Sequence, residues 1–82
     1  MSNREFVKLE VVRYNERYGT AHLKSSLRSL DIYENFVSVR VVSKSQKSTG
    51  YAKCNPCDTP NAKIGLSIAT FRALKRIDGR KP

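Results

Sequence analysis

The segment "FVSVRVV" at 36–42 places the tightest constraint on the fold. Val37, Val39 and Val41 alternate with Ser38 and Arg40, and a period of two residues is that of a β-strand. The valines then share one face of the strand, and the polar side chains share the other. We therefore expect an antiparallel sheet that is covered on its valine face.

The segment "FVKLEVVRY" near the N-terminus has two readings. Its β-branched and aromatic residues, with Val7, Leu9 and Val11 alternating with charges, predict a strand. Val7 and Val11 also lie at helical spacing with Tyr14 and Tyr18, so a helix stays open as the alternative. Next, "NERYG" predicts a turn, since its glycine can adopt positive φ.

The polar segments between the apolar ones are harder to assign. The range 20–35 has no clean period, and "TAHLKSS" at its start is compatible with a second strand. The sequence "SKSQKSTG" predicts an open hairpin loop, after which "YAKC" forms a short strand. That strand should end before Pro56, which cannot donate to a sheet.

A helix is predicted after "NPCDTP". Thr59 fits an N-cap with Pro60 at the first helical position, and Gly79 fits a C-terminal stop. Helical spacing predicts a buried face formed by Ile64, Ile68 and Phe71 with Leu74 beside it, and Leu66, Ala73 and Ile77 extend this apolar sector. It leaves an exposed stripe of two small residues and two bases: Gly65, Ala69, Arg72 and Arg76.

These elements predict a single α+β domain over residues 1–82, with flexible ends at 1–4 and 79–82. Its core is a small antiparallel sheet of three or four strands with a C-terminal helix packed across one face. No apolar run approaches the roughly 20 residues of a membrane span, and the N-terminus has no signal-peptide pattern. We therefore expect a cytoplasmic protein with reduced cysteines.

Charge is distributed unevenly along the chain, whose net charge is +9. Residues 1–39 contain six bases and five acids, whereas residues 40–82 contain ten bases and two acids. A positive potential concentrated in one half favours a polyanionic partner, either nucleic acid or an acidic protein surface.

The spacing Cys54-x-x-Cys57 occurs in zinc knuckles and redox dithiols. Zinc needs four ligands, and His22 is the one further candidate, so a zinc site would require a dimer. A redox cysteine favours a helix N-terminus, whereas Cys54 follows a predicted strand. We interpret both cysteines as incidental and expect no metal or cofactor.

Catalytic groups are similarly sparse. His22 has no paired nucleophile in the sequence pattern, and Asp58 suits a turn or cap. The four tyrosines could stack on bases, but we interpret them as packing at the edge of the core. We therefore expect no enzymatic activity.

Eleven positions between Gly50 and Leu74 resemble a family of small domains from actinobacteria and phages that is double-stranded-RNA-binding-like in shape. The matching positions are Gly50, Ala52, Pro56, Asp58, Ile64, Gly65, Ile68, Ala69, Arg72, Ala73 and Leu74. The resemblance implies a short antiparallel sheet with one C-terminal helix packed across it. It does not extend to the lysine cluster that begins the last helix of true double-stranded-RNA-binding domains, because Lys63 stands alone there.

The leading functional prediction is non-sequence-specific nucleic-acid binding through phosphate contacts. The alternative is a phage-encoded protein that inhibits a host protein by binding its acidic or nucleic-acid-binding surface, and a homodimer stays open. The predicted binding residues are the bases of the second half: Arg40, Lys44, Lys47, Lys53, Arg72, Lys75, Arg76, Arg80 and Lys81.

Overall fold

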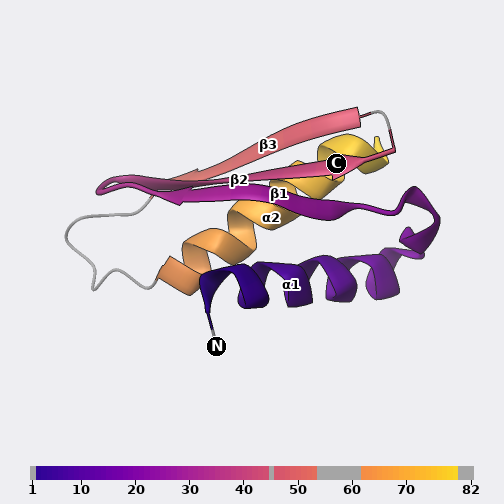
Figure 1. Ribbon diagram of the computed structural model, residues 1–82, viewed down its shortest axis with the longest axis horizontal. Helices are drawn as coiled ribbons and strands as arrows, with labels where there is room; N and C mark the ends of the chain where they lie inside the picture. Colours follow the sequence, from indigo (N-terminus) through magenta and orange to yellow (C-terminus); the bar gives the residue numbers. More distant parts are fainter. Residues whose placement is uncertain (1, 45, 54–61, 80–82) are drawn as a thin grey trace.

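Two helices and a three-stranded sheet form the described part of the computed structural model, residues 2–44, 46–53 and 62–79. The sheet is antiparallel, with strand order β1-β2-β3, and both helices pack against the same face (Figure 1). The predicted α+β class and the helix across the sheet are therefore confirmed. The elements are α1 (Asn3–Tyr18), a short 3-10 helix (Ala21–Leu23), β1 (Ser26–Ile32), β2 (Phe36–Ser43), β3 (Gln46–Lys53) and α2 (Ala62–Asp78).

Strand β2 lies at the centre of the sheet, as its sequence pattern predicts. Val37, Val39 and Val41 are fully buried beneath the helices. They pair with Ala52, Gly50 and Ser48 of β3, so the core face of β3 carries only small side chains. Around them the core continues into both helices, through residues Val7, Val11, Tyr14, Leu66, Ala69, Ala73, Leu74 and Ile77.

Strand β3 corrects the prediction of an open loop over "SKSQKSTG". Residues 46–53 pair continuously with β2, and the turn before them contains Lys44 in the left-handed conformation, with φ +46°. This strand looked like a loop because its core positions are Ser48, Gly50 and Ala52. Small residues are needed there because α2 lies very close.

Gly50 shows how close α2 comes to β3. A Cβ atom on Gly50 would overlap the carbonyl oxygen of Ala69 and stand 2.7 Å from the amide nitrogen of Ala73. The helix backbone therefore packs directly on the strand, which only glycine permits at this position.

This close contact explains why the predicted phase of α2 was partly wrong. Four residues of the predicted apolar sector are buried as expected, namely Leu66, Ala73, Leu74 and Ile77, but its predicted centre is exposed. The buried side of the helix contains Gly65 and Ala69, whereas Ile64 is 60% exposed and Ile68 42% exposed. Phe71, predicted at the centre of the core, is 39% exposed and packs edge-on against Tyr14 of α1 at 5.6 Å. The small residues of α2 face the sheet because larger ones would not fit against β3.

Helix α1 replaces the strand predicted over residues 6–14. Ser2 caps it by accepting a hydrogen bond from the Glu5 amide at 3.1 Å, and Gly19 ends it with φ +66°. Val7, Val11 and Tyr14 form its buried side, so the helical spacing determines the fold. Residues 3 and 4, expected to be flexible, belong to the first turn of this helix.

Strand β1 lies within residues 20–35, where the sequence shows no regular spacing of apolar residues. The spacing is irregular because the strand contains a bulge. The register shifts between Leu27 and Ser29, so Leu27 and Leu30 both pair with core valines of β2 although they are three residues apart. "TAHLKSS" is a 3-10 turn followed by the first residue of β1 rather than a strand of its own.

The predicted C-terminal stop of α2 is confirmed, since Gly79 has φ +72° and its amide donates to the Lys75 carbonyl at 3.0 Å. The predictions for Cys54, Pro56, Cys57, Asp58, Thr59 and Pro60 lie outside the described residues. Within the described ranges, no helix is long and apolar enough to cross a membrane.

Gly50→Ala tests the close helix–sheet contact. Glycine in a strand interior is ordinarily about 0.5–1 kcal/mol less favourable than alanine, so without the contact this change should stabilise the fold. We expect the opposite, a loss of about 1–3 kcal/mol in the free energy of unfolding, because the added methyl group overpacks the interface. Urea unfolding measures the difference, with the exposed Lys47→Ala on the opposite face of β3 as the control. A stability equal to or above that of the wild type would contradict the contact.

Candidate functional site

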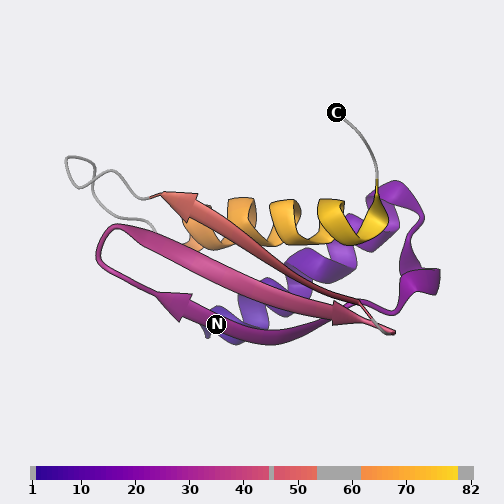
Figure 2. The same ribbon diagram turned by 90° about the horizontal axis from the view of Figure 1, so that it is seen from above.

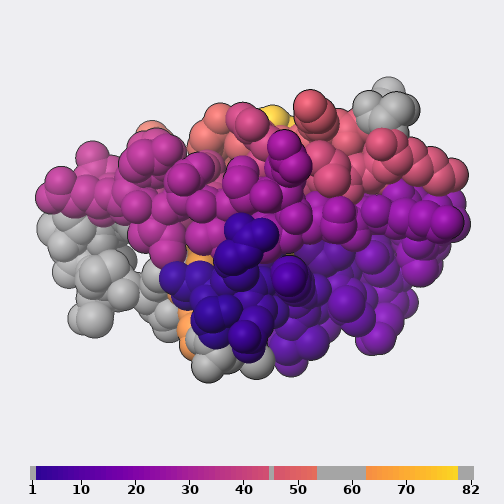
Figure 3. All heavy atoms as spheres, in the orientation of Figure 1, coloured from indigo at the N-terminus to yellow at the C-terminus, as the bar shows by residue number. Residues whose placement is uncertain are grey.

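The face of the sheet that points away from both helices is uncovered in the described structure. Figure 2, which looks down on the molecule, shows α1 passing behind the strands and α2 running alongside the edge of β3, partly behind it. Figure 3 shows the same layering from the side, with the N-terminal helix beneath the strands. Because side chains alternate along each strand, the residues between the core positions share this outer face.

Strand pairing arranges the outer face in rows that run across the strands. One row contains Ser29, Arg40 and Thr49, and the next contains Asp31, Ser38 and Tyr51. Beyond them Phe36 pairs with Lys53, and at the other end Val42 pairs with Lys47. The two central rows and the aromatic residues beside them line a hollow of about 310 Å³.

Three aromatic side chains lie on the outer face. Tyr33, whose amide donates to the carbonyl oxygen of Phe36 at 2.8 Å, is 50% exposed, and Tyr51 is 52% exposed. Tyr33 and Phe36 stack with ring centroids 4.5 Å apart and planes 23° apart, whereas Phe36 and Tyr51 are tilted at 6.2 Å. Large rings therefore stay open to solvent on the side that no helix covers.

The outer face also carries three bases. Arg40, Lys47 and Lys53 are exposed, and the Arg40 Nε donates to Thr49 Oγ1 at 3.4 Å. In the described ranges no carboxylate pairs with these three bases, and the ion pair found there joins Arg13 to Glu10. Their charge is therefore available to an anionic partner.

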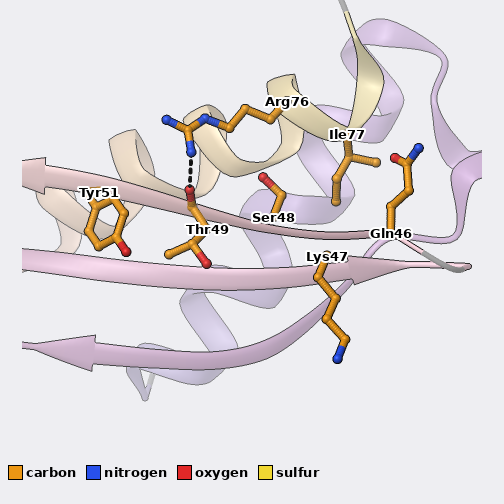
Figure 4. A pocket seen from close by; sticks show the side chains of 7 residues that line it. All are labelled: Gln46, Lys47, Ser48, Thr49, Tyr51, Arg76 and Ile77. Atoms are coloured by element: carbon orange, nitrogen blue, oxygen red, sulfur yellow. Dashed lines mark hydrogen bonds between the residues drawn. The ribbon is translucent and has the colours of Figure 1, made fainter.

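Two arginines of α2 continue this positive surface along the free edge of β3. Arg72 donates through Nη1 to the carbonyl oxygen of Tyr51 at 2.7 Å, and Arg76 donates to that of Thr49 at 3.0 Å. Figure 4 shows Arg76 reaching from α2 to Thr49, and Lys47 pointing away from the helix. Each guanidinium keeps further N–H donors, because a single bond uses one of five.

We call the bases that the structure brings together the basic strip: Arg40, Lys47, Lys53, Arg72 and Arg76. Lys44 lies in the β2–β3 turn at the end of the strip. Lys75 lies apart, with its Nζ 5.8 Å from the centre of the Phe71 ring on another side of α2. Arg80 and Lys81 lie outside the described residues.

The predicted stripe on α2 needs a correction. Arg72 and Arg76 are exposed, as expected, but Gly65 and Ala69 are buried and cannot admit a partner beside them. The two arginines also hold the edge of β3, so they stabilise the fold in addition to carrying charge.

Sequence reasoning missed the aromatic and hydroxyl side chains around the hollow. Tyr33 and Tyr51 were interpreted as edge packing, yet each is about half exposed. Tyr51 alternates with Thr49 and Lys53, so reading residues 46–53 as a strand would have placed it among the bases. His22 lies in the exposed 3-10 turn, and the described residues contain no group of three or more His, Cys, Asp or Glu suited to a metal ion.

Comparison of the chain with models of protein families, with curated proteins and with solved structures finds no match. The resemblance to the actinobacterial and phage family therefore stays a prediction that depends on residues 50–74. Several of its positions are packing residues here, since Gly50, Ala69 and Ala73 meet at the contact between β3 and α2.

The double variant Arg72→Gln with Arg76→Gln tests the structural role of the two arginines. Both hydrogen bonds are exposed, so we expect a loss of about 1–2 kcal/mol in the free energy of unfolding. Urea unfolding measures it, and Arg4→Gln with Arg28→Gln removes the same charge from two other exposed arginines as the control. If the two double variants unfold at the same urea concentration, the edge contacts do not stabilise β3.

Proposed function

We propose that this chain binds nucleic acid through the outer face of its sheet, with the basic strip contacting phosphates. The observation that carries the proposal is the gathering of bases from β2, β3 and α2 beside exposed aromatic rings on a face that no helix covers. Basic surfaces with interleaved aromatic residues are typical of proteins that follow a nucleic-acid backbone.

The dimensions of the strip suit an extended polyanion. Lys47 and Lys53 are six residues apart on β3, which corresponds to about 20 Å at the rise of a strand. Arg72 and Arg76 lie beside the same strand, one helical turn apart, and Arg40 lies on the neighbouring strand. A single backbone could therefore run along β3 and meet several cations.

Phosphate contacts of this kind carry no sequence information. Lysine acts as a point charge, and the two helix arginines already use one donor each on β3 carbonyl oxygens. We therefore expect the affinity of the basic strip to depend strongly on salt and only weakly on sequence.

An acidic protein surface is the alternative partner, as expected of a phage-encoded inhibitor of a host protein. It would use the same bases. Every nucleotide brings a base that can stack on the exposed tyrosines, whereas the carboxylates of an acidic surface contact only the basic residues of the strip. This difference favours nucleic acid.

Arg40→Gln with Lys53→Gln tests the proposal by removing one arginine and one lysine from the outer face. We expect weaker binding to all sequences, because two phosphate contacts are lost. The slope of log affinity against log salt should fall by about 1.4 for a single strand. Fluorescence anisotropy with a labelled oligonucleotide over about 50–200 mM salt measures both quantities.

The matched control is Arg4→Gln with Lys8→Gln, which removes the same two charges from the exposed side of α1. It should leave the salt slope close to that of the wild type. Equal losses in both double variants would show that only net charge matters and would contradict a binding face on the sheet. Absence of binding to any oligonucleotide would favour the acidic protein surface instead.

A further inference from the structure

The hollow on the outer face has a floor and walls that the strand pairing builds. Its floor is Ser38, which is only 8% exposed although neither α1 nor α2 covers this face. The Ser38 side chain lies below its neighbours because they are larger. Phe36 and Arg40 are two residues away on β2, and Asp31 and Tyr51 pair with Ser38 from the strands on either side. The depression is therefore a consequence of one small residue at the centre of the sheet.

The apolar walls of the hollow are formed by aromatic side chains: Tyr33, Phe36 and Tyr51. Tyr51 is half exposed and makes only a tilted contact with Phe36, so one of its surfaces is open for a flat ring to stack on. Phe36 is held from its other side by stacking on Tyr33. Base–aromatic stacking works for every nucleobase, because every base has a π-face.

Polar groups on the rim include both hydrogen-bond donors and acceptors. The Arg40 Nε is occupied by Thr49 Oγ1, which orients the guanidinium and leaves its Nη donors for a ligand. Asp31 supplies a carboxylate, and Ser38 supplies a hydroxyl. A carboxylate repels phosphate, so its place on β1, one strand away from Arg40, favours a ligand group that donates an N–H.

We propose that this hollow binds one unpaired nucleobase, stacked on Tyr51 with its exocyclic amine directed to Asp31. The inference deepens the proposed function and rests on it, since the basic strip would hold the phosphates on either side of the bound base. The preferred ligand is then single-stranded nucleic acid.

A duplex would not fill the hollow. Its bases stack on one another and pair inside the double helix, so Tyr51 could not stack on one unless the base left the duplex at a cost in free energy. A single strand can turn its bases outward onto a flat sheet while its backbone follows the cations. The volume of the hollow, about 310 Å³, lies at the small end of ligand sites and suits one ring system.

The first experiment compares a single strand of about 12 nucleotides with a duplex of the same length, using fluorescence anisotropy at one salt concentration. The wild type should bind the single strand at least about tenfold more tightly. Tyr51→Leu should weaken single-strand binding by about 5- to 150-fold and leave duplex binding unchanged, because it removes the stacking surface. Tyr51→Phe keeps the ring and should bind like the wild type.

Equal affinity for the two ligands, with no effect of Tyr51→Leu, would overturn the base-binding hollow and leave the proposed function in place. Absence of binding to both would overturn the proposed function and the hollow with it. Thermal unfolding of both variants verifies that they are folded. The comparison of ligands on the wild type does not depend on any variant.

The second experiment tests Asp31 with single strands of cytosine only and of thymine only. Cytosine has an exocyclic amine that a carboxylate can accept from, whereas thymine has a carbonyl oxygen at the same position. The wild type should prefer cytosine by about fivefold or more, and Asp31→Ala should abolish the preference.

Glu34→Ala is the matched control, because it removes an acid from the turn after β1 that does not line the hollow. Both acid variants should bind every strand somewhat more tightly, since each loses one negative charge. An unchanged cytosine preference in Asp31→Ala, or no preference in the wild type, would overturn the contact between Asp31 and the base.

Discussion

The direct contact between the backbone of α2 and Gly50 of β3 sets the arrangement of the whole domain. Because the helix comes so close, its buried side must carry small residues at Ala69 and Ala73. Arg72 and Arg76, each three residues further on, are thereby placed where they reach the free edge of β3. The same contact requires small side chains on the core face of β3.

This arrangement leaves one side of the sheet for function. Helices α1 and α2 share the valine face, so the other face has to be compatible with solvent, and most of its residues are polar or charged. Exposed aromatic rings are the exception, and nothing in the core needs them there. Tyr33 stacks on Phe36, but about half of Tyr51 stays exposed, and ligand binding would give that exposed surface a role.

Much of the fold could be predicted wherever local pattern and tertiary contact agree. Strand β2 and the stop at Gly79 are examples, because the alternation and a glycine that can adopt positive φ are visible in the sequence itself. The N-terminal segment had two periods at once, and the helical one is realised, with Val7, Val11 and Tyr14 buried and Ser2 capping the first turn. The phase of α2 could not be predicted, because it depends on a glycine in another element.

The sequence predicted which bases belong to the candidate site, but it did not predict the hollow between them. Arg40, Lys47 and Lys53 were identified from the excess of bases in the second half of the chain. The hollow required the strand register, which brings Asp31, Ser38 and Tyr51 into one row although twenty residues separate the first from the last. A bulge in β1 and a strand that resembled a loop concealed this register.

The most direct test of nucleic-acid binding by the outer face of the sheet is to map backbone amide chemical shifts during titration with a short single-stranded oligonucleotide. If the uncovered face of the sheet binds, the largest changes should occur at Ser38, Arg40, Thr49 and Tyr51. The amides of Val7 and Val11 on α1 should remain unchanged. Changes concentrated on α1, or around Ile64 and Ile68 on the far side of α2, with the sheet unaffected, would contradict it.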